Sequence, residues 1–223
     1  MAERRSEEIL NTLLQTYGTS SSSVRKHSPF EVLITTVISQ NTVEKNAENA
    51  FENLSKRMRI TPEALSKAPR GEIEHCLKTA GLFRRKASTI KEISKRLLKS
   101  GSGDLETILS LPIEQARSRL MQFPGVGPKT ADVVLLFSAN RPTIPVDTHV
   151  HRVSRRLGLV APGANTEMTR KALQELFRHE DYRDVHVLLI AHGRTFCKAR
   201  KPKCERCPTN HLCSARTSEE HRC

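Results

Sequence analysis

The chain has 223 residues, of which 37 are Lys or Arg and 24 are Asp or Glu, giving a formal net charge of +13. An excess this large favours a polyanionic partner, nucleic acid before anionic membrane, although a generally solvated basic surface would also produce it. No apolar run approaches the ~18 residues that span a bilayer, and with 4% aromatic residues and no Trp the chain is not expected to bind single strands on stacked aromatic platforms.

Apolar residues recur at helical spacing along most of the chain, and no sustained alternation competes with this pattern. The sequence therefore predicts an all-α protein of about ten short helices. Thr61 followed by Pro62 predicts a helix start, and GTSSSSV at 18–24 predicts a linker after the first helix. The clearest apolar patterns run from Ile9 to Leu14, Val43 to Leu54, Ile90 to Leu97 and Leu173 to Phe177.

Residues 119–137, RLMQFPGVGPKTADVVLLF, predict two apolar helices joined by a tight turn, with Pro128 beginning the second helix. Gly125 and Gly127, on either side of Val126, permit backbone conformations that a side chain would forbid. They would leave amide groups exposed beside a helix N-terminus, which is a cradle for phosphate. An ordinary helix–turn–helix corner would give the same pattern.

Lys129 follows this turn at the start of the helix. The helix dipole and any low-dielectric surroundings would lower its pKa, and a partly neutral lysine is a nucleophile that can form a Schiff base. A phosphate contact is the alternative. Asp147, in VDTHVHRV, is expected to cap the next helix, yet a carboxylate held beside a neutral lysine would also supply a base and stabilise a cation. His149 and His151 are expected to be structural.

Four of the six cysteines lie in CKARKPKCERCPTNHLC at 197–213, with the spacing C-x6-C-x2-C-x5-C. The chain begins MAERRSEEIL without an apolar signal segment, so we expect a reducing intracellular setting that disfavours disulfides. One C-x-x-C flanked by single cysteines suits a cubane iron–sulfur cluster better than zinc, although zinc or unligated cysteines stay open. Cys76 is expected to be a small buried hydrophobe. The candidate ligands are Cys197, Cys204, Cys207 and Cys213.

The segment between the first two of these cysteines is strongly basic. Four of its six residues carry a positive charge, and this pattern predicts a loop that contacts phosphate. The basic residues are Lys198, Arg200, Lys201 and Lys203.

Taken together, PGVGPKTADVV, VDTHVHRV, AHGRTFCKARKPKCERC and the cysteine spacing resemble the endonuclease III family of helix-hairpin-helix (HhH-GPD) DNA glycosylases. The resemblance runs from SPFEVLI at residue 28 to Cys213. It implies two helical domains either side of a DNA-binding cleft. One, residues 25–141, would be a six-helix bundle holding the hairpin. The other, residues 1–24 with 142–223, would hold a [4Fe-4S] cluster with a structural and DNA-positioning role.

The resemblance also implies an activity, that of a bifunctional DNA glycosylase and abasic-site (AP) lyase of base excision repair. An oxidised pyrimidine would be flipped out of the duplex. Lys129, as the catalytic lysine, would attack C1′ with the help of Asp147, and β-elimination would cleave the strand 3′ to the abasic site. The implied partner is double-stranded DNA with damaged bases or abasic sites, bound by a monomer inside the cell, in the cytoplasm or nucleoid.

In this family a glutamine from an SxQ turn and a leucine from a GLY-like turn fill the gap left by the flipped base. Leu82, in GLFRRKA, matches the leucine. The other turn reads ISQNTVEKN, which puts Asn41 at the position of the glutamine and Gln40 one residue early. Either could fill the gap, and helix-end capping is the alternative for both.

Two other functions stay open. The altered SQN turn allows a mismatch-directed (T/G or U/G) glycosylase of the same superfamily, and the hairpin and basic loop would suit a non-catalytic Fe–S DNA-binding protein. Lys129 argues against the monofunctional relatives that act on mismatches, and residues 32–43 lack the glutamate expected for the adenine-removing branch. A pure binder would not need Lys129 to face a carboxylate.

Overall fold

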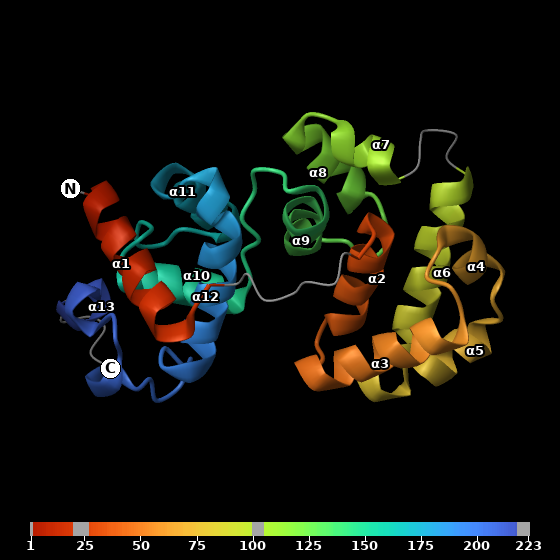
Figure 1. Ribbon diagram of the computed structural model, residues 1–223, viewed down its shortest axis with the longest axis horizontal. Coiled ribbons are helices and arrows are strands. Elements are labelled where there is room, and N and C mark those ends of the chain that lie inside the picture. Colours follow the sequence, from red (N-terminus) through yellow and green to blue (C-terminus); the bar gives the residue numbers. More distant parts are fainter. Residues whose placement is uncertain (1, 20–26, 100–104, 218–223) are drawn as a thin grey trace. The chain divides into compact units, whose positions relative to one another are not determined.

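The computed structural model describes residues 2–19, 27–99 and 105–217, and every regular element in these ranges is helical (Figure 1). The prediction of an all-α protein is confirmed. The predicted number of about ten helices is too low, since the described residues form thirteen α-helices and four 3₁₀ helices. Several of these have four to seven residues, too few to show a hydrophobic period. Of the predicted linker at 18–24, residues 20–24 lie outside the described ranges.

The chain divides into two compact units, Met1–Val24 with Pro142–Cys223, and Arg25–Arg141. In neither unit do the described residues include a helix long and apolar enough to cross a membrane.

The Arg25–Arg141 unit packs around one hydrophobic core that draws on helices along its whole length. The resemblance implied six helices here, whereas the described residues form eight α-helices and one 3₁₀ helix, and three of the α-helices have only six or seven residues. Cys76 lies in this core, as predicted. The helices are α2 (Pro29–Ser39), α3 (Glu44–Arg57), α4 (Pro62–Lys67), α5 (Arg70–Cys76), η1 (Lys78–Ala80), α6 (Phe83–Lys99), α7 (Leu105–Ser110), α8 (Ile113–Met121) and α9 (Pro128–Ala139).

Local signals in the sequence set where several of these helices begin. Ser28 and Glu31 form a capping box at α2, in which Ser28 Oγ accepts the Glu31 N–H at 3.2 Å and Glu31 Oε2 accepts the Ser28 N–H at 2.7 Å. Thr61 caps α4 ahead of Pro62, as predicted. Val43 is not a core residue of α3, because it is the N-cap and its surface is 71% exposed.

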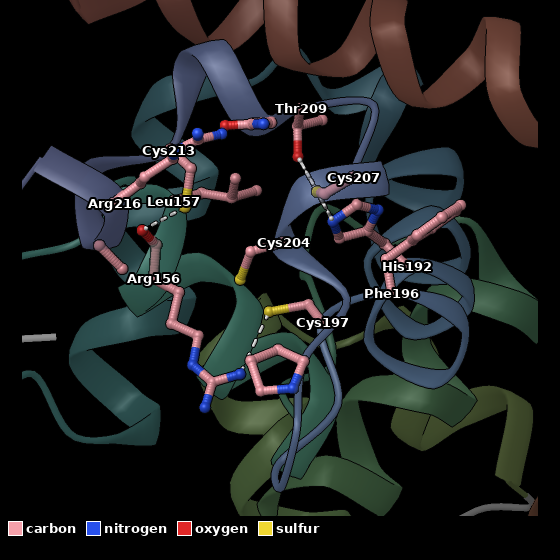
Figure 2. Close-up of a pocket in the computed structure, with 13 residues that line it drawn as sticks. Arg156, Leu157, His192, Phe196, Cys197, Cys204, Cys207, Thr209, Cys213 and Arg216 are labelled. Carbon is pink, nitrogen blue, oxygen red and sulfur yellow. Dashed lines mark hydrogen bonds between the residues drawn. The ribbon is translucent and has the colours of Figure 1, made fainter. Parts of the chain in front are cut away.

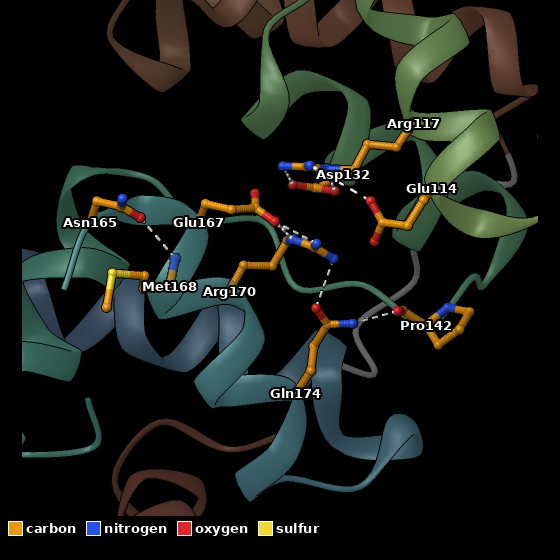
Figure 3. A network of polar contacts seen from close by, with 9 residues as sticks. All are labelled: Glu114, Arg117, Asp132, Pro142, Asn165, Glu167, Met168, Arg170 and Gln174. Atoms are coloured by element: carbon orange, nitrogen blue, oxygen red, sulfur yellow. Dashed lines mark hydrogen bonds and ion pairs between the residues drawn. The ribbon is translucent and has the colours of Figure 1, made fainter. Parts of the chain in front are cut away.

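A buried ion pair joins α8 to α9 (Figure 3). The side chains of Arg117 and Asp132 are 9% and 3% exposed, and Arg117 Nε donates to Asp132 Oδ1 at 2.9 Å. Either charge alone would be costly to bury, so the pair helps to specify how the two helices meet.

The other unit is built around α12 (Tyr182–Thr195), on which α1 (Ala2–Tyr17) and α10 (Thr148–Leu157) both pack. The predicted apolar residues from Ile9 to Leu14 lie in α1. The remaining helices of the unit are α11 (Thr166–Leu176), η2 (His179–Asp181), η3 (Cys204–Arg206), η4 (Asn210–Leu212) and α13 (Ser214–Thr217).

Arg5 ties the first helix of this unit to its last described segment. Its Nη2 donates to Leu157 O, Leu212 O and Ser214 Oγ at 2.5, 2.7 and 2.6 Å. Gly158 ends α10 at φ +71°, and a Cβ there would lie only 2.2 Å from Ser214 Oγ. Glycine therefore both makes the left-handed turn and admits the contact with α13.

Replacing Arg117 by Ala should leave the Asp132 carboxylate without its buried partner. We expect the free energy of unfolding to fall by about 3–5 kcal/mol, measured by urea denaturation followed by circular dichroism. The matched control is Lys56→Ala, which breaks an exposed pair with Glu52 in which the side chains are 71% and 59% exposed. It should change stability by less than about 0.5 kcal/mol. Equal losses in the two variants would contradict a structural role for the buried pair.

Candidate active site and cysteine pocket

The hairpin predicted at residues 123–127 connects α8 to α9, and its two glycines differ. Gly125 has φ +72°, and a Cβ there would lie 3.0 Å from Thr89 Cγ2, so this position requires glycine. Gly127 has ordinary extended backbone and its Cβ would meet no atom, so its predicted conformational role is wrong. Val126 is 5% exposed and points into the core. A phosphate would therefore reach only its backbone.

Lys129 is the second residue of α9, after Gly127 as N-cap and Pro128 as the first helical residue. Its side chain is partly buried. The positive end of the helix dipole is strongest in this first turn. The predicted lowering of the Lys129 pKa stays a prediction.

The turn after α2 directs two neighbouring side chains differently. Gln40 ends the helix, and its Nε2 donates to Gly125 O at 2.9 Å and to Thr130 Oγ1 at 3.3 Å, so the side chain holds the hairpin and the first turn of α9. Asn41 has φ +51° and is exposed. Of the two residues, Gln40 is thus the one whose amide is bonded to the hairpin, and Asn41 is the more exposed.

Leu82 stands at the start of α6 in an unusual conformation. Its φ is +46°, directly after Gly81 at φ +60°, and its side chain is 58% exposed. A left-handed backbone costs an L-residue other than glycine about 1–2 kcal/mol, and exposing a large apolar side chain gains nothing for folding. Strain that does not help the fold is a sign of function.

Asp147 is the N-cap of α10, as predicted, and its Oδ1 accepts the Val150 N–H at 2.8 Å. The segment before it is fixed by two side chains, since Gln174 Nε2 donates to Pro142 O at 2.7 Å (Figure 3) and His186 Nδ1 lies 2.8 Å from Pro145 O. The capping bond uses Oδ1, one of the two carboxylate oxygens. Asp147 belongs to the Pro142–Cys223 part of the chain and Lys129 to the other unit.

The two histidines after Asp147 have structural contacts, as predicted. His151 Nε2 lies 2.8 Å from Ala164 O, and His149 Nδ1 lies 3.0 Å from Arg152 Nη2. Neither contact involves the Asp147 carboxylate.

The four cysteines of the 197–213 segment line one pocket (Figure 2). Figure 2 shows their sulfur atoms arranged around a common space between α10 and the loops that follow α12. The pocket is completed mainly by apolar groups, among them Leu157, Phe196 and Ala215. A dry wall of this kind suits a buried inorganic cofactor with thiolate ligands.

Hydrogen-bond donors surround the sulfurs. Arg156 Nη1 donates to Cys197 Sγ at 3.5 Å, and Cys207 Sγ lies 3.4 Å from His192 Nε2 and 3.3 Å from Thr209 Oγ1. Burial raises the pKa of the Cys213 thiol, and the charges of Cys197 and Cys207 raise it further. Burial and mutual repulsion thus favour the neutral thiol at Cys213, and a cation among the sulfurs would reverse this preference.

His192 is 1% exposed, and burial lowers its pKa to about 4, so it is neutral at pH 7. Burial raises the pKa of Tyr17 to about 12, and Tyr17 Oη lies 3.2 Å from His192 Nδ1. We assign Tyr17 as the donor in this bond, which places the imidazole proton on Nε2, facing Cys207. A donor in this position stabilises a thiolate ligand.

Cys197, Cys207 and Cys213 are free thiols of intermediate exposure. No three His, Cys, Asp or Glu side chains in the described ranges are grouped to hold a metal ion.

The four basic residues of the loop, Lys198, Arg200, Lys201 and Lys203, are all exposed, as a phosphate-binding role requires. Two arginines of α10 fix the loop by hydrogen bonds to its backbone carbonyl groups. Arg156 donates to Lys198 O at 2.7 Å and to Ala199 O at 3.3 Å, and Arg152 Nε donates to Cys197 O at 3.0 Å. The loop thus presents its charges on a fixed backbone.

A family model described as "HhH-GPD superfamily base excision DNA repair protein" matches residues 34–179, more than half of the chain. The chain belongs to this superfamily. Endonuclease III of Thermotoga maritima is 36% identical over 189 residues, covering 85% of this chain and 84% of the relative. Endonuclease III of Escherichia coli K12 is 34% identical over 206 residues, covering 92% and 93%.

Among solved structures, a trapped endonuclease III–DNA covalent intermediate matches with a TM-score of 0.81 and 31% identity over 96% of each chain. The predicted resemblance to endonuclease III is confirmed along nearly the whole chain. This HhH-GPD protein is a base excision DNA repair enzyme of the endonuclease III type.

Sequence patterns did not reveal which side chains support the site. Gln40 was expected either to cap a helix or to fill a gap, and it does cap α2, but no local signal indicates its bond to the hairpin. The anchoring roles of Arg152, Arg156 and His192 also had no sequence signal, because arginine and histidine on a helix are ordinarily solvated or packed.

Proposed function

We propose that this chain excises oxidised pyrimidines from double-stranded DNA and then cleaves the strand 3′ to the abasic site, with Lys129 as the nucleophile. It is a DNA glycosylase with AP lyase activity. The observation that carries the assignment of the nucleophile is the place of Lys129 in the first turn of α9, directly after the glycine hairpin. The solved relative described as a trapped covalent intermediate supports a mechanism in which the enzyme bonds to DNA.

Base flipping comes first, since the glycosidic carbon cannot be reached inside the stack. Leu82 would wedge into the duplex, and Asn41 would fill the gap. Gln40 is less suited to this role because its amide is bonded to the hairpin. A shorter amide at this position would reach less far than glutamine and could alter the preference for the opposite base.

In the chemical steps, neutral Lys129 Nζ forms a bond to C1′ while the glycosidic bond breaks and its electron pair leaves with the base. Asp147 would assist by accepting a lysine proton and by stabilising the cationic sugar. Ring opening yields an iminium ion, which acidifies the 2′ proton. Loss of this proton expels the 3′ phosphate oxygen, and water then releases the lysine. The proposal requires both units to engage the same nucleotide.

The same proposal covers the iron–sulfur cluster, the oligomeric state of the protein and its place in the cell. Cys197, Cys204, Cys207 and Cys213 would hold a [4Fe-4S] cluster, whose part is to cross-link the loop that carries the basic residues. One chain contains every residue assigned to the reaction, so we propose that it acts as a monomer, inside the cell, on DNA with damaged bases.

Protein purified without oxygen should contain about four irons and four acid-labile sulfides per chain. Cys207→Ser should lower both contents, whereas Cys76→Ser should not, because Cys76 is a core residue of the other unit. Chemical assay of iron, sulfide and zinc decides the matter. Stoichiometric zinc in place of iron would refute the cluster.

Neutralising the basic loop, with Gln at Lys198, Arg200, Lys201 and Lys203, should flatten the dependence of DNA affinity on salt. Each phosphate contact contributes about 0.9 to the slope of log K against log salt, so four contacts would lower it by up to about 3.6. Fluorescence anisotropy with duplex DNA at several salt concentrations measures the slope. If it stays unchanged, the loop does not contact phosphate.

Lys129→Gln should abolish covalent trapping by borohydride on duplex DNA containing thymine glycol or an abasic site, while binding of the duplex stays nearly unchanged. The control Lys56→Gln removes an exposed lysine of α3 and should trap like the wild type. A covalent band from the Lys129 variant would show that another amine is the nucleophile.

Asp147→Asn separates capping from chemistry, because Asn caps helices as well as Asp does. We expect unchanged stability and a fall in the single-turnover excision rate of about 10²- to 10⁴-fold. Asp147→Ala should show the same loss of rate together with about 1 kcal/mol less stability. Full excision by the Asn variant would limit Asp147 to capping.

A further inference from the structure

Lys86 is a buried lysine of α6 that the proposed reaction does not use. Its surface is only 5% exposed. Its Nζ donates to Ile38 O at 2.8 Å, to Thr42 Oγ1 at 2.5 Å and to Ala80 O at 2.6 Å. An ammonium group has three N–H donors, and all three are satisfied.

These three acceptors lie on two separate turns. Ile38 and Thr42 flank the turn that exposes Asn41, and Ala80 precedes the turn that exposes Leu82. The backbone N–H of Lys86 also donates to Leu82 O at 3.0 Å. One residue thus contacts both turns directly.

Thr42 closes the connection between the turns. Its hydroxyl donates to Ala80 O while it accepts from Lys86 Nζ, and it lies 3.1 Å from Gln40 O. The network contains no side chain of Asn41 or Leu82, both of which remain exposed. The network therefore fixes the backbone of the Asn41 and Leu82 turns and leaves these two side chains available.

The surroundings of Lys86 argue against a role as a second nucleophile. A buried ammonium with three hydrogen-bond acceptors has no path to a substrate carbon. Burial lowers the pKa of Lys86, which means that the fold bears a desolvation cost for keeping this amine inside. Asn41 and Leu82 both have left-handed backbone, and this conformation persists only where surrounding contacts hold it.

We propose that Lys86 is a positioning residue that holds the Asn41 and Leu82 turns as one rigid pair. The wedge, which is the Leu82 side chain, and the plug, which is the Asn41 side chain that fills the gap, then enter the duplex together. The inference rests on the proposed function, in which these two side chains replace the flipped base. Pre-organising two groups on different turns matters for rate, since a misplacement of about 1 Å costs up to about 100-fold.

The test compares two substrates for Lys86→Met. Excision of thymine glycol from duplex DNA requires a wedge and a plug, whereas borohydride trapping at an abasic site in single-stranded DNA requires neither. We expect the duplex rate to fall by about 10- to 100-fold and the single-strand rate to stay within about twofold.

Lys91→Met is the matched control. Lys91 lies on the same helix, and its Nζ likewise donates to two carbonyl oxygens, those of Ser66 and Ala68, which belong to neither turn. Both of its rates should stay within about twofold of the wild type. A loss of duplex activity equal to that of Lys86→Met would overturn the inference, because a general effect of removing a lysine bond would then explain both.

Thr42→Val provides a second variant if Lys86→Met does not fold. It removes the bridging hydroxyl and should show the same duplex-specific loss in a smaller degree. In the Leu82→Ala background, Lys86→Met should lower the duplex excision rate by a smaller factor than it does in the wild type, because Lys86 acts through Leu82. If the two substitutions lowered this rate by independent factors, the inference would be overturned.

The two proposals fail in different ways. A wild-type chain inactive on both substrates would overturn the proposed function and this inference with it. An active wild type, with Lys86→Met impaired equally on both substrates or on neither, would overturn this inference alone.

Discussion

The buried pair of Arg117 and Asp132 is the constraint on which the presentation of the proposed nucleophile depends. It fixes α8 against α9, and the short turn between these helices leaves little freedom for the first turn of α9. Gln40 adds a second restraint by bonding to Gly125 O and Thr130 Oγ1, on either side of Lys129. The lysine therefore stands on a backbone held from two directions, and only its own side chain needs to move.

Positive side chains serve the interior of this protein as well as its surface. Arg5, Arg141, Arg152 and Arg156 each donate to at least two backbone carbonyl oxygens, and Lys86 and Lys91 do the same. Such bonds satisfy carbonyl groups at the ends of helices and in loops, where no helical partner exists. Part of the positive charge therefore stabilises loops and helix ends, while exposed basic residues, among them those of the 198–203 loop, remain available to a partner.

The sequence predicted the features that depend on neighbouring residues. The helix starts at Pro62 and Pro128, the cap at Asp147 and the burial of Cys76 all follow from local rules of capping and hydrophobicity. The choice between Gln40 and Asn41 did not follow, because the bond that occupies Gln40 comes from a residue 85 positions along the chain. Likewise nothing near Lys86 in sequence reveals the carbonyl of Ile38, and the exposed Val43 only looked like the first apolar position of a helix. Contacts of this kind depend on the packing of helices, which periodicity cannot specify.

The bonds from Arg5 to Leu157, Leu212 and Ser214 have a consequence for the order of synthesis. The first helix leaves the ribosome before these partners, and the cysteine segment follows only after about 180 further residues. The Arg25–Arg141 unit is contiguous in sequence, so it can fold while translation continues. The other unit cannot fold until the segment after residue 142 has also been made. A chain that ended after residue 141 would therefore contain the hairpin unit together with a first helix that lacks its partners, and the cysteine pocket can form only once residue 213 has been made.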